Sequence, residues 1–360
     1  MYFLGNIKDI HELDLTPTNV HIDSWLFKLY KLTGIAFVFL SILVSARLYS
    51  GHPMVCTETK ELPEDLINAY CWMNSTFTVS LPKDGHTDNR LTTVGTEFYT
   101  TGSVKQKYHK YYQWFSLVLL LLSSLCYLPV YLWNRLERGK LELLILGLDS
   151  DAITESVKNA RKKNLLHYLI KNLHTHKMYA LVFFCCEVGV LFLIGAQRSF
   201  MNSFFEEELF MFYYKIVLDL IIGSKTTRSN MLSELFPKLT KCTFRMHGPT
   251  GELQVFNSLC LLPVNIVAEK VFTALWLWLN ILLLVSLILL TSRLMAISFS
   301  AIRVYALMPK FRNAPQAKIR KLIQLMDFGD FFILKLILRK IDESICVELV
   351  SDLSEALFKK

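Results

Sequence analysis

The residues of this chain best suited to chemistry are its cysteines, because a thiol can oxidise to a disulfide or bind a soft metal ion. The chain has eight: Cys126, Cys185 and Cys186 lie within long apolar segments, and Cys346 lies near the C-terminal end. The other four lie in polar stretches between apolar segments: Cys56, Cys71, Cys242 and Cys260. We predict that these four form two disulfides on an oxidising side of a membrane. The sequence leaves all three possible pairings open.

The carboxylate of Glu187 is a second candidate, because it stands in the middle of an apolar segment. An ionisable group at that depth faces a bundle interior or a water-filled path, which makes it a candidate for function. The alternative is a protonated or hydrogen-bonded carboxyl that only packs. The sequence does not separate these two roles.

Asn74 begins the N-glycosylation signal Asn74-Ser75-Thr76, three residues after Cys71. A glycan there would block a docking surface. His174 and His176 have no further metal ligand near them in the sequence, and no motif such as HExxH or GxSxG occurs. We therefore expect no enzymatic activity, no metal and no cofactor.

The composition points to a membrane protein. Of the 360 residues 52% are hydrophobic and only 19% are charged, with a mean hydropathy of +0.35. Soluble domains reach about 45–50% apolar residues even when glycine is included. The first 25 residues lack the continuous apolar core of a signal peptide, so the first spanning segment is expected to direct its own insertion.

A helix needs roughly 20 mostly apolar residues to cross a bilayer. Four segments meet this requirement: 25–46, 115–133, 178–197 and 271–292. The segment 209–222 is apolar but shorter, and Lys215 and Asp219 interrupt it. We interpret it as an extension of the third helix or as a helix packed on the protein. Tyr111, Tyr112 and Trp114 precede the second span and are expected at the membrane boundary.

The distribution of positive charge predicts the orientation. Of the 39 lysines and arginines, 24 lie in the segments 1–31, 134–177 and 293–360. Cytoplasmic segments carry the excess of positive charge, so both termini and the 134–177 loop are predicted to be cytoplasmic. The loops 47–114 and 198–270, which hold the four paired cysteines, are then outside.

The segments outside the membrane carry their own patterns. Residues 243–256 are typical of a β-hairpin around a Gly-Pro-Thr-Gly turn. Residues 316–326 and 341–358 repeat apolar residues at helical spacing, and residues 1–24 are amphipathic. We therefore predict an all-α four-helix membrane bundle with a disulfide-bonded outer cap containing a small hairpin. A helical cytoplasmic dome is predicted from 134–177 and 293–360.

Several motifs in this order resemble the innexins, the gap-junction proteins of invertebrates, over nearly the whole chain. They are Arg47-Leu-Tyr-Ser-Gly-His-Pro, Tyr70-Cys71-Trp72, Lys107-Tyr-His-Lys-Tyr-Tyr-Gln-Trp, Phe236-Pro237-Lys238, Leu262-Pro263-Val264-Asn265 and Gly329-Asp330-Phe331.

The resemblance implies a ring of about eight identical subunits, possible mixing with other innexins, and docking to a ring in the neighbouring cell. It also implies the disulfides Cys56–Cys260 and Cys71–Cys242, and a place in the plasma membrane at cell–cell junctions. The N-terminal helix 1–24 and the first span would line a wide pore. Candidate pore-lining residues are Tyr2, Phe3, Leu4, Ser41 and Ser45. Partners would be further subunits and membrane lipids, with no nucleic acid.

The function implied is passive passage of ions and small metabolites between adjacent cells, because selectivity in a wide pore comes from its width and lining charge. Two alternatives stay open. One is an undocked hemichannel that releases metabolites such as ATP. The other is a membrane adhesion or scaffold protein that does not conduct.

Overall fold

In the computed structural model the described residues are 24–51, 53–57, 63–80, 105–145, 148, 154–205, 208–222, 235–247, 251–311 and 316–358. They form two compact units, each made of several chain segments. The cap unit comprises Tyr30–Tyr127 and Leu191–Leu284. The tail unit comprises Met1–Leu29, Leu128–Val190 and Val285–Lys360.

Four helices are long and apolar enough to cross a membrane: α1 (Trp25–Ser50), α3 (Phe115–Glu137), α6 (Lys177–Phe204) and α9 (Pro263–Ser298). A 3-10 turn, η2 (Tyr111–Trp114), leads directly into α3. Each long helix contributes residues to both units. Their apolar residues are exposed at many positions, for example Phe39 at 65% and Ile288 at 65%, as expected for helices that face lipid.

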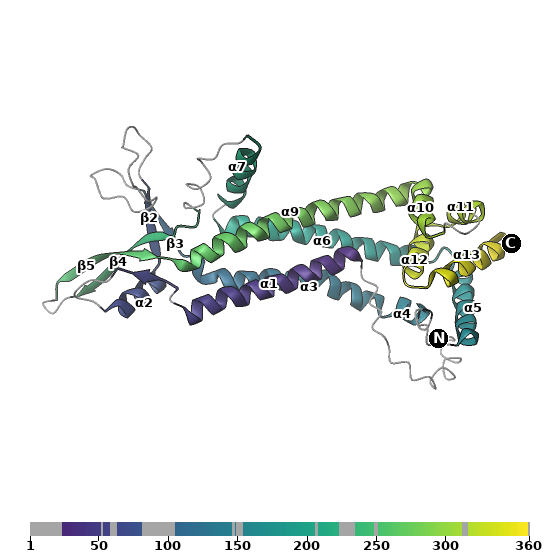
Figure 1. The fold of residues 1–360 in the computed structure, drawn as a ribbon, viewed down its shortest axis with the longest axis horizontal. Coiled ribbons are helices and arrows are strands. Elements are labelled where there is room, and N and C mark those ends of the chain that lie inside the picture. Colours follow the sequence, from purple (N-terminus) through teal and green to yellow (C-terminus); the bar gives the residue numbers. More distant parts are fainter. Residues whose placement is uncertain are drawn as a thin grey trace. The chain divides into compact units, whose positions relative to one another are not determined.

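The cap unit contains a five-stranded antiparallel sheet in the order β1-β5-β4-β2-β3 (Figure 1). The strands are β1 (Val55–Cys56), β2 (Thr76–Ser80), β3 (Lys105–His109), β4 (Leu239–His247) and β5 (Leu253–Leu261). The hairpin expected at 243–256 is therefore longer than predicted, and its turn residues 248–250 lie outside the described part. The three other strands come from the loop between α1 and α3, so both loops build one sheet.

Buried polar contacts hold the helices of the cap unit together. Gln197 on α6 is fully buried; its Nε2 donates to the carbonyl of Leu122 at 2.9 Å, and its Oε1 accepts from the Tyr30 hydroxyl at 3.1 Å. Gly34 allows α1 and α3 to approach closely, since an added Cβ would lie 3.0 Å from the Cβ of Cys126. Both features place polar or small residues where helices meet, as is usual in membrane bundles.

The apolar segment 209–222 forms a separate helix, α7 (Glu208–Ile222), and is not an extension of α6. It packs on α9, where the Tyr213 ring stacks on Trp276 at 4.5 Å and the Tyr213 hydroxyl lies 2.8 Å from Thr273 Oγ1. With 15 residues α7 is too short to cross a bilayer. This agrees with the second of the two interpretations of the segment.

The tail unit is helical throughout its described part. Besides the ends of the long helices it contains α4 (Lys140–Ile145), α5 (Glu155–Lys171), α10 (Ser300–Leu307), η3 (Met308–Phe311), α11 (Gln316–Leu325), α12 (Phe328–Leu338) and α13 (Glu343–Phe358). The amphipathic segments 316–326 and 341–358 correspond to α11 and α13. Helix α12 was not predicted, because it is buried on nearly every side and therefore shows no polar face.

Candidate functional site

The disulfide Cys56–Cys260 joins the first strand of the cap unit to the last. Cys56 on β1 is paired directly with Cys260 on β5 in the sheet register, so the two Cα atoms lie 3.9 Å apart. The backbone N–H of Cys56 also donates to the Asn68 side chain at 2.8 Å. Both cysteines are buried.

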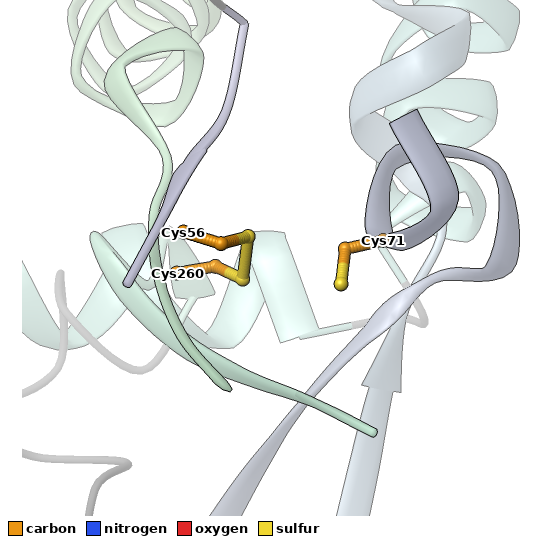
Figure 2. A group of neighbouring side chains, drawn as sticks. All are labelled: Cys56, Cys71 and Cys260. Atoms are coloured by element: carbon orange, nitrogen blue, oxygen red, sulfur yellow. A yellow bond between two sulfur atoms is a disulfide. The ribbon is translucent and has the colours of Figure 1, made fainter. Parts of the chain in front are cut away.

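The second disulfide, Cys71–Cys242, fastens helix α2 (Glu64–Asn74) to strand β4. Glu64 and Asp65 stand in the first turn of α2, where negative charge favours the helix dipole. Ile67 and Cys71 are one turn apart and form its buried face. Figure 2 shows Cys71 on α2 beside the Cys56–Cys260 bond. These are the pairs that the family resemblance implied. Oxidised sulfurs are not thiolates, so this cluster is not a metal site.

Aromatic side chains fill the space between the sheet and the start of α3. Tyr112 is fully buried and its ring lies 4.9 Å from that of Trp72, while the Tyr111 hydroxyl donates to the carbonyl of Leu235 at 2.9 Å. Trp114 alone of the three predicted boundary residues is well exposed, at 56%. Tyr112 packs inside the cap unit and Tyr111 is half-buried. Both stand at the start of the candidate span Tyr111–Glu137, and their place at a membrane boundary stays a prediction.

His109 at the end of β3 is buried and lies with its Nε2 2.8 Å from the Thr78 hydroxyl on β2. Burial, and to a lesser degree the charge of Lys107, lowers the pKa of His109 from 6.5 to about 4. The imidazole is therefore neutral in the folded cap at neutral pH. His109 belongs to the motif Lys107-Tyr-His-Lys-Tyr-Tyr-Gln-Trp, but its burial was not predicted.

Asn74 is the last residue of α2 and is exposed, and its side-chain amide donates to the Tyr70 hydroxyl at 3.0 Å. The third residue of its glycosylation signal, Thr76, begins β2 and is fully buried. The acceptor amide thus lies at the surface of the cap unit, while the third residue of the signal is folded into the sheet.

The predicted pore-lining residues fall into three groups. Tyr2, Phe3 and Leu4 lie outside the described residues. Ser41 is 2% exposed, and its hydroxyl donates to the carbonyl of Ser116 on α3 at 2.9 Å, so it faces the neighbouring helix and is not free to line a pore. Ser45 is half-buried and remains a prediction.

Glu187 on α6 is 3% exposed and paired. The Ser24 hydroxyl donates to its Oε1 at 2.9 Å, and Nη2 of Arg293 lies 3.3 Å from the same oxygen. The Arg293 guanidinium in turn lies over the rings of Phe183 and Phe332, 5.6 and 5.4 Å from their centroids. These contacts satisfy Oε1 alone, because Oε2 is buried without a hydrogen-bond partner among the described residues, so the packing role and the functional role both stay predictions.

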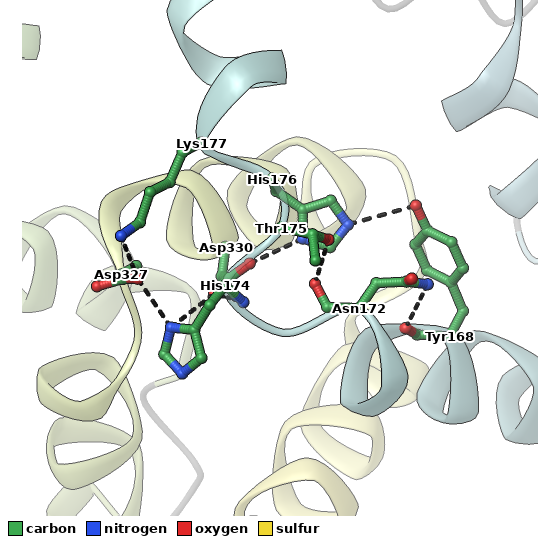
Figure 3. A network of polar contacts seen from close by, with 8 residues as sticks. All are labelled: Tyr168, Asn172, His174, Thr175, His176, Lys177, Asp327 and Asp330. Carbon is green, nitrogen blue, oxygen red and sulfur yellow. Dashed lines mark hydrogen bonds and ion pairs between the residues drawn. The ribbon is translucent and has the colours of Figure 1, made fainter.

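A cluster of histidines and aspartates, which we call the clasp, joins the end of the 134–177 loop to the start of α12. Figure 3 shows Asp330 accepting from the backbone N–H of His174 at 2.8 Å and lying 2.7 Å from the His176 ring. Asp327 contacts the His174 ring at 2.8 Å and Lys177 Nζ at 3.0 Å. Hydrogen bonds from His174 and then from Lys177 lower the pKa of the Asp327 carboxyl.

The clasp explains the Gly329-Asp330 motif. A Cβ on Gly329 would lie 2.7 Å from the backbone of His176 and Lys177, so only glycine lets α12 approach this closely. The sequence analysis found no further ligand for the histidines because their carboxylate partners lie more than 150 residues away. Both carboxylates of the clasp already contact the histidines, and Asp327 also pairs with Lys177, which fits a structural role.

Comparison with known proteins decides which family this arrangement belongs to. A sequence model described as Innexin matches residues 23–357. The chain belongs to the innexin family. It is 38% identical to Innexin inx2 of Schistocerca americana over 354 residues, covering 98% of this chain and 97% of that protein. It is 36% identical to Innexin inx2 of Drosophila melanogaster, covering 98% and 95%, and 34% identical to Innexin shaking-B of the same species, covering 94% and 91%.

Innexins are gap-junction channel proteins, and the four long apolar helices of this innexin fit a multi-pass membrane channel. The family assignment follows from nearly the full length of the chain. The cap unit and the clasp are thus parts of a membrane channel protein.

Proposed function

We propose that this innexin forms a ring that docks with a ring in an adjacent cell, giving a wide channel for ions and small metabolites. The family match over 23–357 carries the proposal. The ring would contain about eight subunits, alone or mixed with other innexins. Both termini and the tail unit would be cytoplasmic, and the cap unit would face the neighbouring cell in the plasma membrane.

The cap unit supports docking because two disulfides cross-link it. Its two disulfides tie α2, β1, β4 and β5 together across sequence separations of 204 and 171 residues. A surface ordered before contact loses less conformational entropy on binding, which favours association. The proposal therefore predicts that docking depends on the bridges.

Paired electrical recording tests this function. The protein is expressed in two apposed cells, and junctional and single-cell currents are measured for the natural sequence, Cys56→Ser and the control Cys185→Ser. Cys185 is an exposed free cysteine in α6, so its loss leaves the cap unchanged. Junctional current that vanishes only in Cys56→Ser supports a docked channel; no current in any configuration would overturn the proposal in favour of a scaffold.

An undocked hemichannel is the second candidate, and the exposed position of Asn74 on the cap favours it. A glycan at this residue would hold two rings apart. We then expect single-cell current without coupling, and coupling restored by Asn74→Gln. Treatment with a glycosidase and a shift in electrophoretic mobility would show whether the glycan is present.

A further inference from the structure

A hollow of about 220 Å³ lies in the cap unit between α6, the first turn of α7 and α9. Its lining includes Arg198, Ser199, Asn202, Leu209, Phe210 and Trp276. The first three belong to one face of α6, since residues three and four apart in a helix are neighbours.

The hollow is built by a specific contact between helices. Asn202 Oδ1 on α6 accepts the backbone N–H of Phe210 at 2.9 Å, which fixes the start of α7 against α6. At the other side the Tyr213 ring stacks on Trp276 and attaches α7 to α9. The walls are therefore set by contacts of three helices.

Arg198 supplies a charged hydrogen-bond donor to the lining of the hollow. Its Nε is buried and makes no hydrogen bond with any described residue. Burying a charged donor without an acceptor costs free energy, so an acceptor in the hollow would stabilise this arrangement. A guanidinium matches the paired oxygens of a phosphate. The Ser199 hydroxyl is a second donor at the same wall.

The surroundings of the hollow are apolar and suit lipid. Phe210, Met211 and Tyr214 of α7 are 48%, 58% and 56% exposed, and Leu277 and Ile281 of α9 are each 50% exposed. Arg198 directly follows the span expected at 178–197, at the level where phospholipid head groups lie. A helix with such an apolar face lies in the interface plane of a membrane.

We propose that this hollow binds the phosphodiester of a phospholipid in the membrane leaflet next to the cap unit. The Arg198 guanidinium and the Ser199 hydroxyl donate to the phosphate oxygens. The acyl chains lie on the exposed residues of α7 and α9, and α7 rests in the membrane interface. The same phosphodiester chemistry occurs in water-soluble glycerophosphate esters, and the experiment separates the two sources.

Native mass spectrometry of the assembled full-length protein in detergent tests the site. The probes are dioleoylphosphatidylcholine and the soluble ester glycerophosphocholine. We expect Arg198→Gln to raise the phospholipid concentration for half-saturation about tenfold, the loss expected for one charge-assisted hydrogen bond. Arg198→Lys keeps the charge and should lose less. The matched control is Arg245→Gln on β4, an exposed arginine remote from the hollow-lining residues.

A soluble ester that competes as well as the lipid would overturn the lipid assignment and leave only an anion site. Equal lipid binding by the natural protein and Arg198→Gln would overturn the proposal itself. If Arg198→Gln loses ring assembly but retains lipid as the natural protein does, Arg198 binds a neighbouring subunit and not a lipid, and the proposal is overturned. Retained disulfides and assembly size show that each variant is folded.

Discussion

The cap unit and the tail unit link distant chain segments through different kinds of bond. Both hold together chain segments that are more than 150 residues apart. The cap unit uses two disulfides and a sheet. The described part of the tail unit uses ion pairs and hydrogen bonds, and its buried Cys346 is a free thiol. Disulfides persist only in oxidising surroundings, so this contrast is what the orientation proposed above for this innexin predicts. Four experiments below test this contrast.

The largest effect is expected from removing the bridge of β1 and β5. With Cys71–Cys242 still closed, Cys56→Ser combined with Cys260→Ser opens a loop of 33 residues (204 − 171), which the chain-entropy model values at about 4 kcal/mol. Amide hydrogen exchange should accelerate strongly in β1 and β5 and stay unchanged in α12 and α13. Cys185→Ser is the control. Equal acceleration in both units would contradict the separation proposed here.

A smaller loss is expected in the tail unit from Asp330→Asn. The amide oxygen carries no charge, so the contacts of Asp330 with the His174 backbone N–H and the His176 ring lose their charge assistance, which costs about 1.5–3 kcal/mol. Exchange should accelerate in α12 and in the first turn of α6. Asp342→Asn removes a carboxylate that lies 4.0 Å from Lys158 and is 42% exposed, so it should cost less than about 1 kcal/mol. A reducing agent should not change the exchange rates of α12 or α6 in either variant.

Mild acid should weaken the cap unit before the clasp. The pKa of His109 is lowered to about 4 on folding, so below pH 6.5 the unfolded chain binds a proton that the folded cap does not. Stability should fall by about 1.4 kcal/mol for each pH unit between 6.5 and about 4.

The lowered pKa of Asp327 affects stability at a lower pH than the lowered pKa of His109 does. Its stabilisation is present above the ordinary pKa of 3.8 and is lost as the pH falls below that value. Hydrogen exchange of β3 and α12 from pH 7 to 4 measures both units at once. His109→Gln should remove the pH dependence of β3; if the slope persists, another group carries it.

The smallest effect is expected from Lys162→Met on α5. Lys162 Nζ lies 2.8 Å from Glu348 and 3.3 Å from Asp352 on α13, and hydrogen bonding to Glu348 raises the pKa of the lysine. Both carboxylates are well exposed, so the pairs should contribute about 1 kcal/mol or less and weaken with salt. Exchange in α13 measured at low and high salt checks this. A salt effect of equal size in β5 would contradict the comparison.

The parts of the fold that the sequence predicted are those with a local signal. The four long helices carry unbroken apolar runs, and α11 and α13 carry a polar face and an apolar face. The helix α12 carries neither signal: it has 11 residues and is apolar almost all round. The strand β2, Thr-Phe-Thr-Val-Ser, does alternate in polarity and could have been found by that pattern.

The parts of the candidate site that could not be predicted depend on contacts between distant segments. His174 and His176 were visible as a pair, but Asp327 and Asp330 lie on the far side of two long helices in the sequence. Ser41 illustrates the same limit, since residue type alone suggested a pore. Its hydroxyl instead donates to the carbonyl of Ser116 on α3, a contact that the sequence does not show.

The distance in sequence between the bridged cysteines has a consequence for biosynthesis. Cys56 must wait until the ribosome has added 204 more residues, about 10–40 s at 5–20 residues per second. During most of that time Cys71 is the nearest thiol on the same side, so a premature Cys56–Cys71 bond is the accessible product. Native pairing then requires thiol–disulfide exchange once Cys242 and Cys260 arrive. Production of this channel should therefore be limited by the disulfide isomerase of the secretory pathway.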